Sequence, residues 1–592
     1  MHVISKVKIQ NYKSIIDHEF VLSDYTPLVG YNNAGKTNIL QAVSWLIKKY
    51  SLKHNEYHDV EHPVVVTAEL SGITEEVLGA LGDQHRERIR PFLQNQKINI
   101  RRTQHQPGVP ATQIRLEIST TDPEGQETWH LNPAGIDAAI AYLFPEPVFV
   151  GAMDDVAEDV GKFGTSTTIG KLIGEITRPI TEANAGPVAE ALGEVARRLA
   201  SDGQEKDENL VRIDGLIQAQ LGRLFPGVSA KTHIPIPAFS EFLKGATIRI
   251  YDVGHPAAGG RDATAFGHGA QRAVQIALIK CLSELRRANA GGRTTLLLLD
   301  EPELYLHPQA VELIRASLVR LSSEGYQVLF TTHSPAMISR RDAHKVLLVR
   351  RSVERGTHAY PRIEDAVALA IDSADHQAEI LFALTNSSKV LFAERVVLAE
   401  GKTERALLPD IFHHRMNATL SEERIALVDL GGVDNVPNAM NVLAAMGMSV
   451  RAVVDLDFVF RGAIASQLVR HDHDAIVGCK AILQRLADAG QIGLNADGLP
   501  RSANGVSASQ AFALMASQQE AQAHLQNLHD SLLLRGVWFW MKGSIETHLG
   551  LHSKNANAHR AFLDSFQDEE FQRELPDYTS VCSMLDWLRA GG

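Results

Sequence analysis

The chain has 592 residues, and at roughly 100 to 200 residues per domain it has room for about three to five structural units. Apolar residues make up 44% and charged residues 22%, which is typical of a folded α/β protein and excludes a disordered chain. The net charge of −12 disfavours nucleic acid at face value, yet a binding surface requires only a local basic cluster, so charge alone excludes no nucleic-acid partner.

The first motif follows a predicted strand, Asp24 to Val29. The segment Gly30 to Thr37 matches G-x-x-x-x-G-K-[ST], in which backbone amides surround phosphates, the lysine reaches the outer phosphates and the hydroxyl ligates magnesium. Asn38 to Tyr50 has helical periodicity, so the phosphates would meet a helix N-terminus. The pattern predicts an ATP site, with its binding residues at Gly30, Asn33, Gly35, Lys36, Thr37 and Asn38.

A helical insert is predicted after several strands. From about Thr168 to Leu224 the apolar residues are spaced three and four apart, which indicates three helices. These helices must bury their apolar stripes on the chain's own sheet or in a homodimer contact. The strands expected before them are Val64 to Leu70, Ile98 to Arg102, Gln113 to Ile118 and Pro147 to Val150.

A second motif supports nucleotide chemistry. Thr295 to Leu299 contains four consecutive leucines, which is typical of a strand buried on both faces of a parallel sheet. The next two residues are Asp300 and Glu301. Asp300 can hold the Mg²⁺ shell, and Glu301 can orient or deprotonate the attacking water. With the glycine loop, these carboxylates predict that the chain binds and hydrolyses ATP.

The surrounding sequence resembles the ABC-type ATPase head of SMC-like, RecF-like and OLD-family proteins. The resemblance rests on Asp300 to Pro308 and on Thr331 to Pro335, which follows the strand Gln327 to Phe330. It implies that His333 contacts the γ-phosphate.

The segment Phe266 to Arg272 occupies the place of the ABC signature. The resemblance implies that Gly269 and the helix after it close over the γ-phosphate of a nucleotide held by a second subunit. His268 stands where the family has serine, which leaves open whether this signature supports hydrolysis or only binding.

The C-terminal third follows a linker-like stretch near Asp372 to Ser388 and begins with a strand, Arg395 to Glu400. Gly401 should let the chain turn so that Glu400 and Glu404 face one cavity. After a further strand, Arg424 to Leu430, the run Ser449 to Asp457 ends in D-x-D. Period two along a strand would place Asp455 and Asp457 on one face, with Leu456 in the core. Such carboxylates suit hard cations, Mg²⁺ or Mn²⁺.

A strand-end glutamate followed by strand-D-x-D is similar to a TOPRIM domain, and Val537 to Glu546 resembles the K-G-x-I-E segment that closes OLD-family TOPRIM domains. The resemblance implies that Lys542 stabilises charge on the scissile phosphate and that Glu546 completes the metal set. The predicted metal ligands are Glu400, Glu404, Asp455, Asp457 and Glu546, with Thr37 at the nucleotide's cation. The predicted catalytic residues are Lys542, Glu400, Asp455, Glu301 and His333.

The order of the parts resembles the OLD family of ATP-binding endonucleases, which includes the Gabija nuclease subunit and retron-associated members. It implies an α/β chain: an ABC-type ATPase domain over 1–375, with a helical dimerisation insert at about 165–225, and a TOPRIM nuclease domain over 390–592. The implied cofactors are ATP and Mg²⁺ or Mn²⁺. The implied partners are DNA, further copies of the chain in a homodimer or larger assembly, and a protein or nucleic acid of a bacterial anti-phage system.

Two rival interpretations stay open. In the first, the chain is a DNA-binding sensor or tethering ATPase whose TOPRIM domain cuts nothing; the retained acids and Lys542 argue against it, whereas His268 and the acidic net charge leave it room. The second, a topoisomerase-like strand transferase, requires a tyrosine nucleophile on a DNA-docking domain, and no such domain is evident in the sequence.

The sequence also predicts the compartment. No apolar run approaches the roughly 20 residues of a membrane-spanning helix, and Met1 to Lys6 looks like a strand rather than a signal peptide. Three widely spaced cysteines, Cys281, Cys479 and Cys582, argue for a reducing compartment and against a disulfide or zinc framework. We therefore expect a cytoplasmic protein without a membrane partner.

Overall fold

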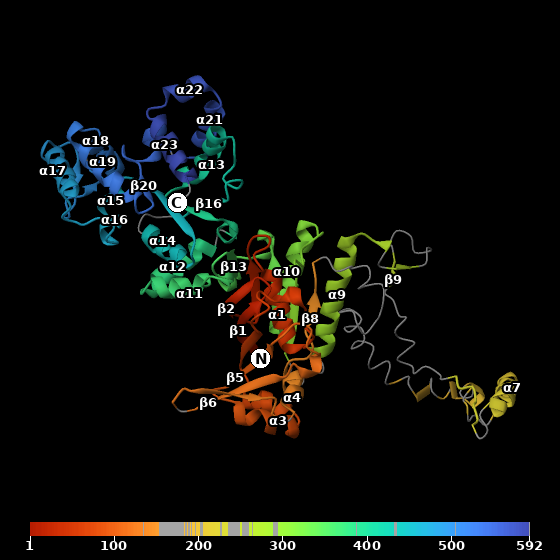
Figure 1. Ribbon diagram of the computed structural model, residues 1–592. Coiled ribbons are helices and arrows are strands. Elements are labelled where there is room, and N and C mark those ends of the chain that lie inside the picture. The colour runs from red at the N-terminus through yellow and green to blue at the C-terminus, as the bar shows by residue number, and fades with distance from the viewer. Residues whose placement is uncertain are drawn as a thin grey trace. The chain divides into compact units, whose positions relative to one another are not determined.

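The structure is a computed structural model of the chain (Figure 1). The residues that it describes are 1–122, 124–133, 135–152, scattered positions between 183 and 201, 205–224, 228–234, 249–251, 260–262, 265–287, 294–385, 388–430, 435–503, 505–553 and 555–590.

Contacts divide the chain into two compact units. The first comprises Met1–Val7, Leu22–Tyr25 and Ile39–Thr331, and the second comprises Lys8–Val21, Thr26–Asn38 and Thr332–Gly592. The glycine loop and His333 therefore group with the C-terminal third, whereas Asp300 and the signature segment belong to the first unit. The boundary expected between 375 and 390 stays a prediction.

The largest sheet has twelve strands in the order β7-β6-β5-β4-β1-β2-β14-β13-β3-β12-β11-β8. Strand β11 pairs in parallel with β12 and β8, and all five of its residues are buried, which confirms the expected strand buried on both faces. The strands are β1 Val3–Tyr12, β2 Ile15–Val21, β3 Tyr25–Val29, β4 Val64–Ser71, β5 Ile98–Gln104, β6 Leu116–Thr121, β7 Glu127–Leu131, β8 Val148–Val150, β11 Thr295–Leu299, β12 Tyr326–Thr332, β13 Leu347–Ser352 and β14 Gly356–Ala359.

The strands expected in this sheet are present, and their bounds differ most at one start. The strand expected from Gln113 begins at Leu116, because Ala111–Gln113 forms a 3-10 turn. Up to residue 323, the α-helices whose bounds are described are α1 Lys36–Ile47, α2 Glu75–Ala80, α3 Asp83–Ile89, α4 Ile136–Leu143, α7 Glu208–Leu224, α9 His268–Arg287 and α10 Pro308–Ser323. The short strands β9 Arg249–Ile250 and β10 Arg261–Asp262 pair with each other.

The third helix of the predicted insert is present as α7. Its apolar side chains are largely exposed: Val211 is 53% and Leu216 is 64% accessible. The first predicted helix lies outside the described residues, and only scattered positions of the second are described. The use of this insert for dimerisation remains a prediction.

The C-terminal third is built on a four-stranded parallel sheet in the order β16-β15-β17-β20. Its strands are β15 Arg395–Ala399, β16 Ile425–Asp429, β17 Ser449–Val454 and β20 Val537–Phe539. Alternate residues enter two separate cores: Leu398 and Val454 pack in one, whereas Val397, Val453 and Trp538 pack in the other. Helices therefore cover both faces of the sheet (Figure 1), as parallel sheets require.

The helices of this third, with two small strands, are α11 Ile363–Ala370, α12 Ala374–Thr385, α13 Lys402–Met416, α14 Val436–Ala445, α15 Asp457–Phe460, α16 Gly462–Ala465, α17 Asp474–Asp488, β18 Gly493–Leu494, β19 Pro500–Arg501, α18 Ala508–Ala516, α19 Gln519–Leu533, α20 Ile545–Leu549, α21 Ala556–Phe566, α22 Glu569–Glu574 and α23 Tyr578–Arg589. The expected linker near Asp372 to Ser388 is wrong, because most of it forms α12. Ile380 and Leu384, one helical turn apart, are buried in the core.

No helix among the described residues is both long and apolar enough to cross a membrane.

Candidate nucleotide and metal sites

The glycine loop runs from the end of β3 into α1, which begins at Lys36. Asn33 and Gly35 have φ of 63° and 94°, in the region that favours glycine. A Cβ on Gly35 would lie 2.1 Å from Thr357 Oγ1, so a larger residue does not fit. The strand, loop and helix expected for phosphate binding are therefore present.

A network of hydroxyl groups anchors this loop. Thr357 Oγ1 donates to Ala34 O at 2.8 Å and lies 2.7 Å from Ser14 Oγ, and Asn38 Nδ2 donates to Ser14 Oγ at 2.7 Å. Asn38, expected to bind the nucleotide, thus also fixes the loop. Sequence reasoning missed Ser14 and Thr357, because they lie 343 residues apart and belong to no motif.

Lys36 and His333 lie together within the second unit. The ammonium of Lys36, which is 5% exposed, donates to Gly30 O and Tyr31 O at 3.0 Å each and lies 2.8 Å from His333 Nε2. Because a lysine ammonium can only donate, the histidine nitrogen accepts in this pair. The two residues expected to face the outer phosphates are therefore adjacent.

The end of β11 is held from two sides within the first unit. Thr331 Oγ1 donates to Asp300 Oδ1 at 2.5 Å and accepts from Glu301 N at 2.9 Å. Arg272 donates to Asp300 O at 3.0 Å and Glu301 O at 3.1 Å. Glu301 has φ of 46°, a strained conformation for a non-glycine residue that often marks functional sites. Thr331 and Arg272 belong to the recognised motifs, but their hydrogen bonds were not predicted.

The signature segment forms a helix start as expected, because α9 begins at His268. A Cβ on Gly269 would lie 2.8 Å from Tyr305 O, so glycine permits a close approach to the loop after Glu301. The His268 ring lies 5.0 Å from the Tyr305 ring. His268, which stands where the resemblance expects serine, thus packs against a neighbouring ring.

The carboxyl ends of β15, β17 and β20 meet at one edge of the four-stranded sheet. Ala399 is in register with Val453, and Val454 with Phe539, so Glu400 and Asp455 leave neighbouring parallel strands. Glu400 Oε2 accepts a hydrogen bond from Asp455 N at 2.9 Å. Residues 55 positions apart in sequence are therefore brought together, as the TOPRIM pattern predicts.

The strand geometry expected for the D-x-D motif is wrong. Strand β17 ends at Val454, Leu456 has φ of −61° and ψ of −30°, and Asp457 opens the short helix α15. Period two therefore does not relate Asp455 to Asp457. The predicted burial of Leu456 is confirmed, at 0% exposure.

The other two predicted acids are buried: Glu404 is 2% and Glu546 is 6% exposed. Thr403 Oγ1 donates to Glu546 Oε1 at 2.5 Å. Gly401 has an extended backbone, so it does not make the expected sharp turn. Instead it leaves space for the carboxylate of Glu404, since a Cβ at position 401 would lie 2.9 Å from Glu404 Oε2.

This donor set suits a hard divalent cation, because its ligands are carboxylate oxygens, and buried carboxylates require compensating charge or hydrogen bonds. Among the residues that the structure describes, however, no three His, Cys, Asp or Glu side chains are grouped closely enough to hold a metal ion. The strand ends are gathered, but the described side chains do not form a closed set of metal ligands.

Lys542 lies in the turn between β20 and α20. The turn depends on Gly543, whose φ is 118°, a conformation that only glycine adopts readily. Lys542 Nζ lies 3.1 Å from Asp577 Oδ2, and about half of its side chain is exposed. Sequence reasoning missed Asp577, which stands outside every motif that was recognised.

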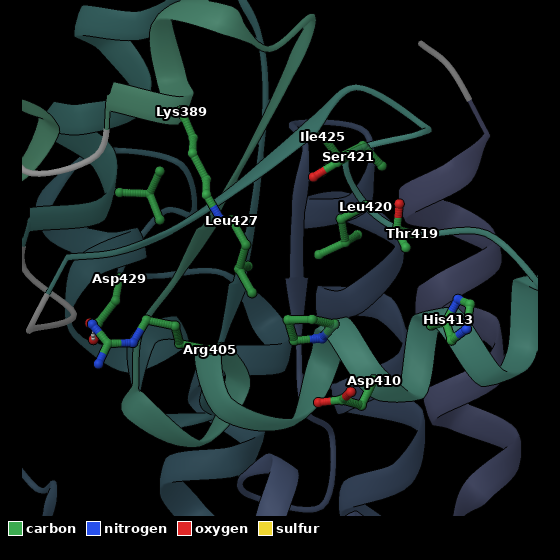
Figure 2. Close-up of a pocket in the computed structure, with 12 residues that line it drawn as sticks. Lys389, Arg405, Asp410, His413, Thr419, Leu420, Ser421, Ile425, Leu427 and Asp429 are labelled. Atoms are coloured by element: carbon green, nitrogen blue, oxygen red, sulfur yellow. Dashed lines mark ion pairs between the residues drawn. The ribbon is translucent and has the colours of Figure 1, made fainter. Parts of the chain in front are cut away.

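A cavity of about 540 Å³ lies beside the edge strand β16. Figure 2 shows Arg405 of α13 facing Asp429 of β16, an ion pair of 3.7 Å. Lys389, Asp410 and His413 also line the cavity, so its lining carries charged groups of both signs. None of the predicted site residues is among the described residues that line it.

Comparisons with known proteins identify the family. The AAA ATPase domain model matches residues 3–105 and 167–338, and the model of the TOPRIM domain of Overcoming lysogenization defect protein-like proteins matches residues 391–457. The chain is 31% identical over 597 residues to the Old nuclease of Escherichia phage P2, and the match covers 99% of each chain. The chain belongs to the OLD nuclease family.

Two further comparisons cover parts of this OLD nuclease. An OLD nuclease of Thermus scotoductus is 28% identical over 194 residues, which is 32% of this chain and 35% of the relative. An Smc head bound to the C-terminal winged-helix domain of ScpA is 17% identical, with a TM-score of 0.33, over 60% of this chain and 96% of that structure.

The family and the fold class predicted from the sequence are confirmed. The chain is a nuclease with an ATPase domain and a C-terminal TOPRIM domain. Nucleotide binding and the use of divalent metal follow from these two domains.

Proposed function

We propose that this OLD nuclease binds ATP and uses Mg²⁺ or Mn²⁺ to nick or cut the phosphodiester backbone of DNA. The observation that supports this most is the meeting of Glu400 with Asp455 at the carboxyl ends of parallel strands. The turn that holds Lys542 is joined to the same loop, because Leu456 N donates to Gly543 O at 2.8 Å.

In this proposal Glu400, Glu404, Asp455, Asp457 and Glu546 hold the cations. The chemistry that divalent cations supply at such sites is activation of a water and stabilisation of the leaving oxygen. Lys542 is a compact positive charge that stabilises the negative charge developing on the scissile phosphate. Thr403, through its hydrogen bond to Glu546, orients one of the carboxylates.

The nucleotide would bind at the glycine loop. Lys36 would move from the loop carbonyls to the outer phosphates, with His333 beside it. The remaining proposed ligands are Gly30, Asn33, Gly35, Thr37, Asn38 and Asp300. Glu301 would orient or deprotonate the attacking water, and Gly269 would approach the nucleotide of a second copy.

This arrangement implies a homodimer or larger assembly. We further propose domains at 1–375 and 390–592, a cytoplasmic location and a role in bacterial defence against phage, with or without a partner protein or nucleic acid.

The cutting activity is tested with supercoiled plasmid DNA and Mg²⁺ or Mn²⁺. We expect the wild-type protein to nick or linearise the plasmid, and Asp455→Ala and Lys542→Ala to lose most of that activity. Lys480→Ala is the matched control, because Lys480 lies on α17 and donates to Asp497 O, outside the proposed site. Equal nicking by all four proteins would remove the assignment.

The second candidate is a DNA-tethering ATPase that cuts nothing. One observation favours it: no group of three potential ligands is preassembled in the described part of the chain. A titration with divalent ions separates the two candidates, because a tethering protein gives no cleaved product at any ion concentration, whereas a nuclease gives product that rises with the ion and saturates.

A further inference from the structure

We propose that Asp577 is a positioning residue that holds Lys542 for catalysis. The proposal rests on the proposed role of Lys542 at the scissile phosphate. Asp577 precedes α23, the last helix of the described chain, and lies outside the β20, α20 and strand-end segments that contain the predicted site.

Lys542 and Asp577 form an ion pair through one carboxylate oxygen of Asp577. Lys542 Nζ lies 3.1 Å from Asp577 Oδ2, and the Asp577 side chain is 15% exposed while that of Lys542 is 49% exposed. Lys542 Nζ also points toward Pro576 O, at 3.5 Å. A flexible lysine that is half in solvent is thus held at its charged end by a carboxylate that is mostly shielded from water.

The carboxylate itself is fixed by α23 and by α20. Asp577 is the N-cap of α23, because its Oδ1 accepts from Ser580 N at 3.4 Å. Ser580 Oγ also donates to Oδ2 at 2.9 Å. The Asp577 backbone N donates to His548 O at 3.0 Å, and His548 Nε2 lies 3.5 Å from Oδ2. Although burial raises the pKa of Asp577, the hydrogen bonds from Lys542 and Ser580 outweigh it and lower that pKa, so the carboxylate is charged at neutral pH.

The held lysine is coupled to the acidic loop through the backbone. Gly543, the next residue, accepts from Leu456 N at 2.8 Å, between Asp455 and Asp457. A displacement of the Lys542 turn would therefore also reach the proposed cation ligands. Placement errors of about 1 Å can cost roughly 100-fold in rate, so a carboxylate that restricts Lys542 affects the chemical step.

A substitution that keeps the helix cap can separate a positioning role of Asp577 from a purely structural one. Asn is about as good an N-cap as Asp, so Asp577→Asn retains the helix cap and removes the charge that holds Lys542. The matched control is Asp568→Asn, which makes the same change at the N-cap of α22, where Asp568 accepts from Glu570 N at 2.9 Å.

The experiment measures single-turnover plasmid cutting and DNA affinity for the wild type, Asp577→Asn, Asp568→Asn, Lys542→Ala and the double variant Lys542→Ala with Asp577→Asn. We expect Asp577→Asn to slow cutting by about tenfold or more, with DNA affinity unchanged or tighter because a negative charge is removed. Asp568→Asn should cut like the wild type. In the Lys542→Ala background, Asp577→Asn should cause no further loss.

Two results would overturn the proposal: wild-type cutting by Asp577→Asn, or an equal fold-loss from Asp577→Asn with and without Lys542. If cutting by Lys542→Ala is too slow to compare, the proposal is overturned when Asp577→Asn weakens DNA affinity as much as cutting, because a folding defect affects both. Wild-type cutting by Lys542→Ala itself would instead reject the role proposed for that lysine, which is a separate failure.

Discussion

At the scale of single residues, the buried ammonium of Lys36 is hydrogen-bonded to groups of the glycine loop itself. Lys36 donates to Gly30 O and Tyr31 O and touches His333. These partners belong to the chain itself, so a bound nucleotide must compete with them. The gain from phosphate binding is therefore the difference between two sets of charge-assisted hydrogen bonds.

Replacing this lysine should separate folding from nucleotide binding. ATP with Mg²⁺ at about 100 times its Kd should stabilise the wild type by roughly 2.7 kcal/mol and raise its thermal midpoint. Lys36→Met should lose most of that rise. Lys8→Met, which removes an exposed ion pair with Asp17, should keep it, and an equal ATP-dependent rise in both variants would contradict the assignment.

Individual site residues could be predicted where their chemistry is contiguous in sequence. Lys36, Asp300 and Lys542 stand in short motifs, so spacing and resemblance were sufficient to identify them. Ser14 and Asp577 could not be found in this way, because each reaches its partner across the fold through one ordinary polar side chain. A serine or aspartate outside a motif has no distinguishing pattern.

At the scale of elements, the turn between β3 and α1 requires a residue without a side chain at position 35. Gly35 has φ of 94°, and its Cβ would overlap Thr357 Oγ1. Gly35→Ala should cost roughly 1 to 3 kcal/mol from backbone strain, with more from the overlap, and should weaken ATP binding. The thermal midpoint and the ATP-dependent rise measure these two effects.

The control for that substitution is Gly79→Ala in α2. Apart from its chain neighbours and the backbone of its own helix, nothing lies within 4 Å of a Cβ built there. Alanine in a helix is better than glycine by up to about 1 kcal/mol. This variant should be as stable as the wild type or slightly more so. A Gly35→Ala protein as stable as Gly79→Ala would show that the loop relaxes easily.

The packing of α19 on β20 should make stability sensitive to acid. His529 is 4% exposed and its ring lies 4.5 Å from that of Trp538, and burial lowers its pKa. The unfolded chain therefore binds the proton more readily, and stability that is full above the unfolded pKa of about 6.5 falls as the pH drops below it.

His529→Phe should reduce the fall in thermal midpoint between neutral and mildly acidic pH. Part of the fall should remain, because burial also lowers the pKa of His2, His18, His358 and His548. The exposed His471→Gln serves as control. If both variants lost stability with acid as the wild type does, the buried imidazole would not be the cause.

Elements were predictable where one pattern dominates, as in the leucine strand β11. They were not predictable where tertiary context decides. The D-x-D segment turns into α15 because its chain leaves the sheet at Asp455, and alternation along the sequence does not report where a strand ends. Helix α12 was missed because its polar N-terminal half resembles a linker.

At the scale of the whole molecule, the aromatic ring of Tyr31 in the glycine loop contacts the C-terminal third within the second unit. Tyr31 has Arg350 at 4.4 Å and Arg424 at 5.5 Å from its centroid. Arg424 pairs with Glu394, and its carbonyl accepts from the backbone N of Glu394 and of Arg395, where β15 begins. Lys36 bonds the carbonyl of the same tyrosine, so nucleotide binding should disturb this contact.

Tyr31→Leu tests that connection. We expect the variant to keep its ATP-dependent rise in thermal midpoint, because the backbone of the loop is unchanged. The ratio of DNA cutting with ATP to cutting without ATP should move toward one. An unchanged ratio would show that the ring does not transmit the state of the loop.

The most direct test of the nuclease assignment is Mn²⁺ binding, measured by electron paramagnetic resonance without nucleotide so that the glycine loop contributes nothing. We predict saturable binding by the wild type and its loss in the double variant Glu400→Gln with Asp455→Asn. That result would mean that the carboxylates at the strand ends assemble into a metal site when the ion binds. Equal Mn²⁺ binding by the wild type and the double variant would contradict the placement of the metal site.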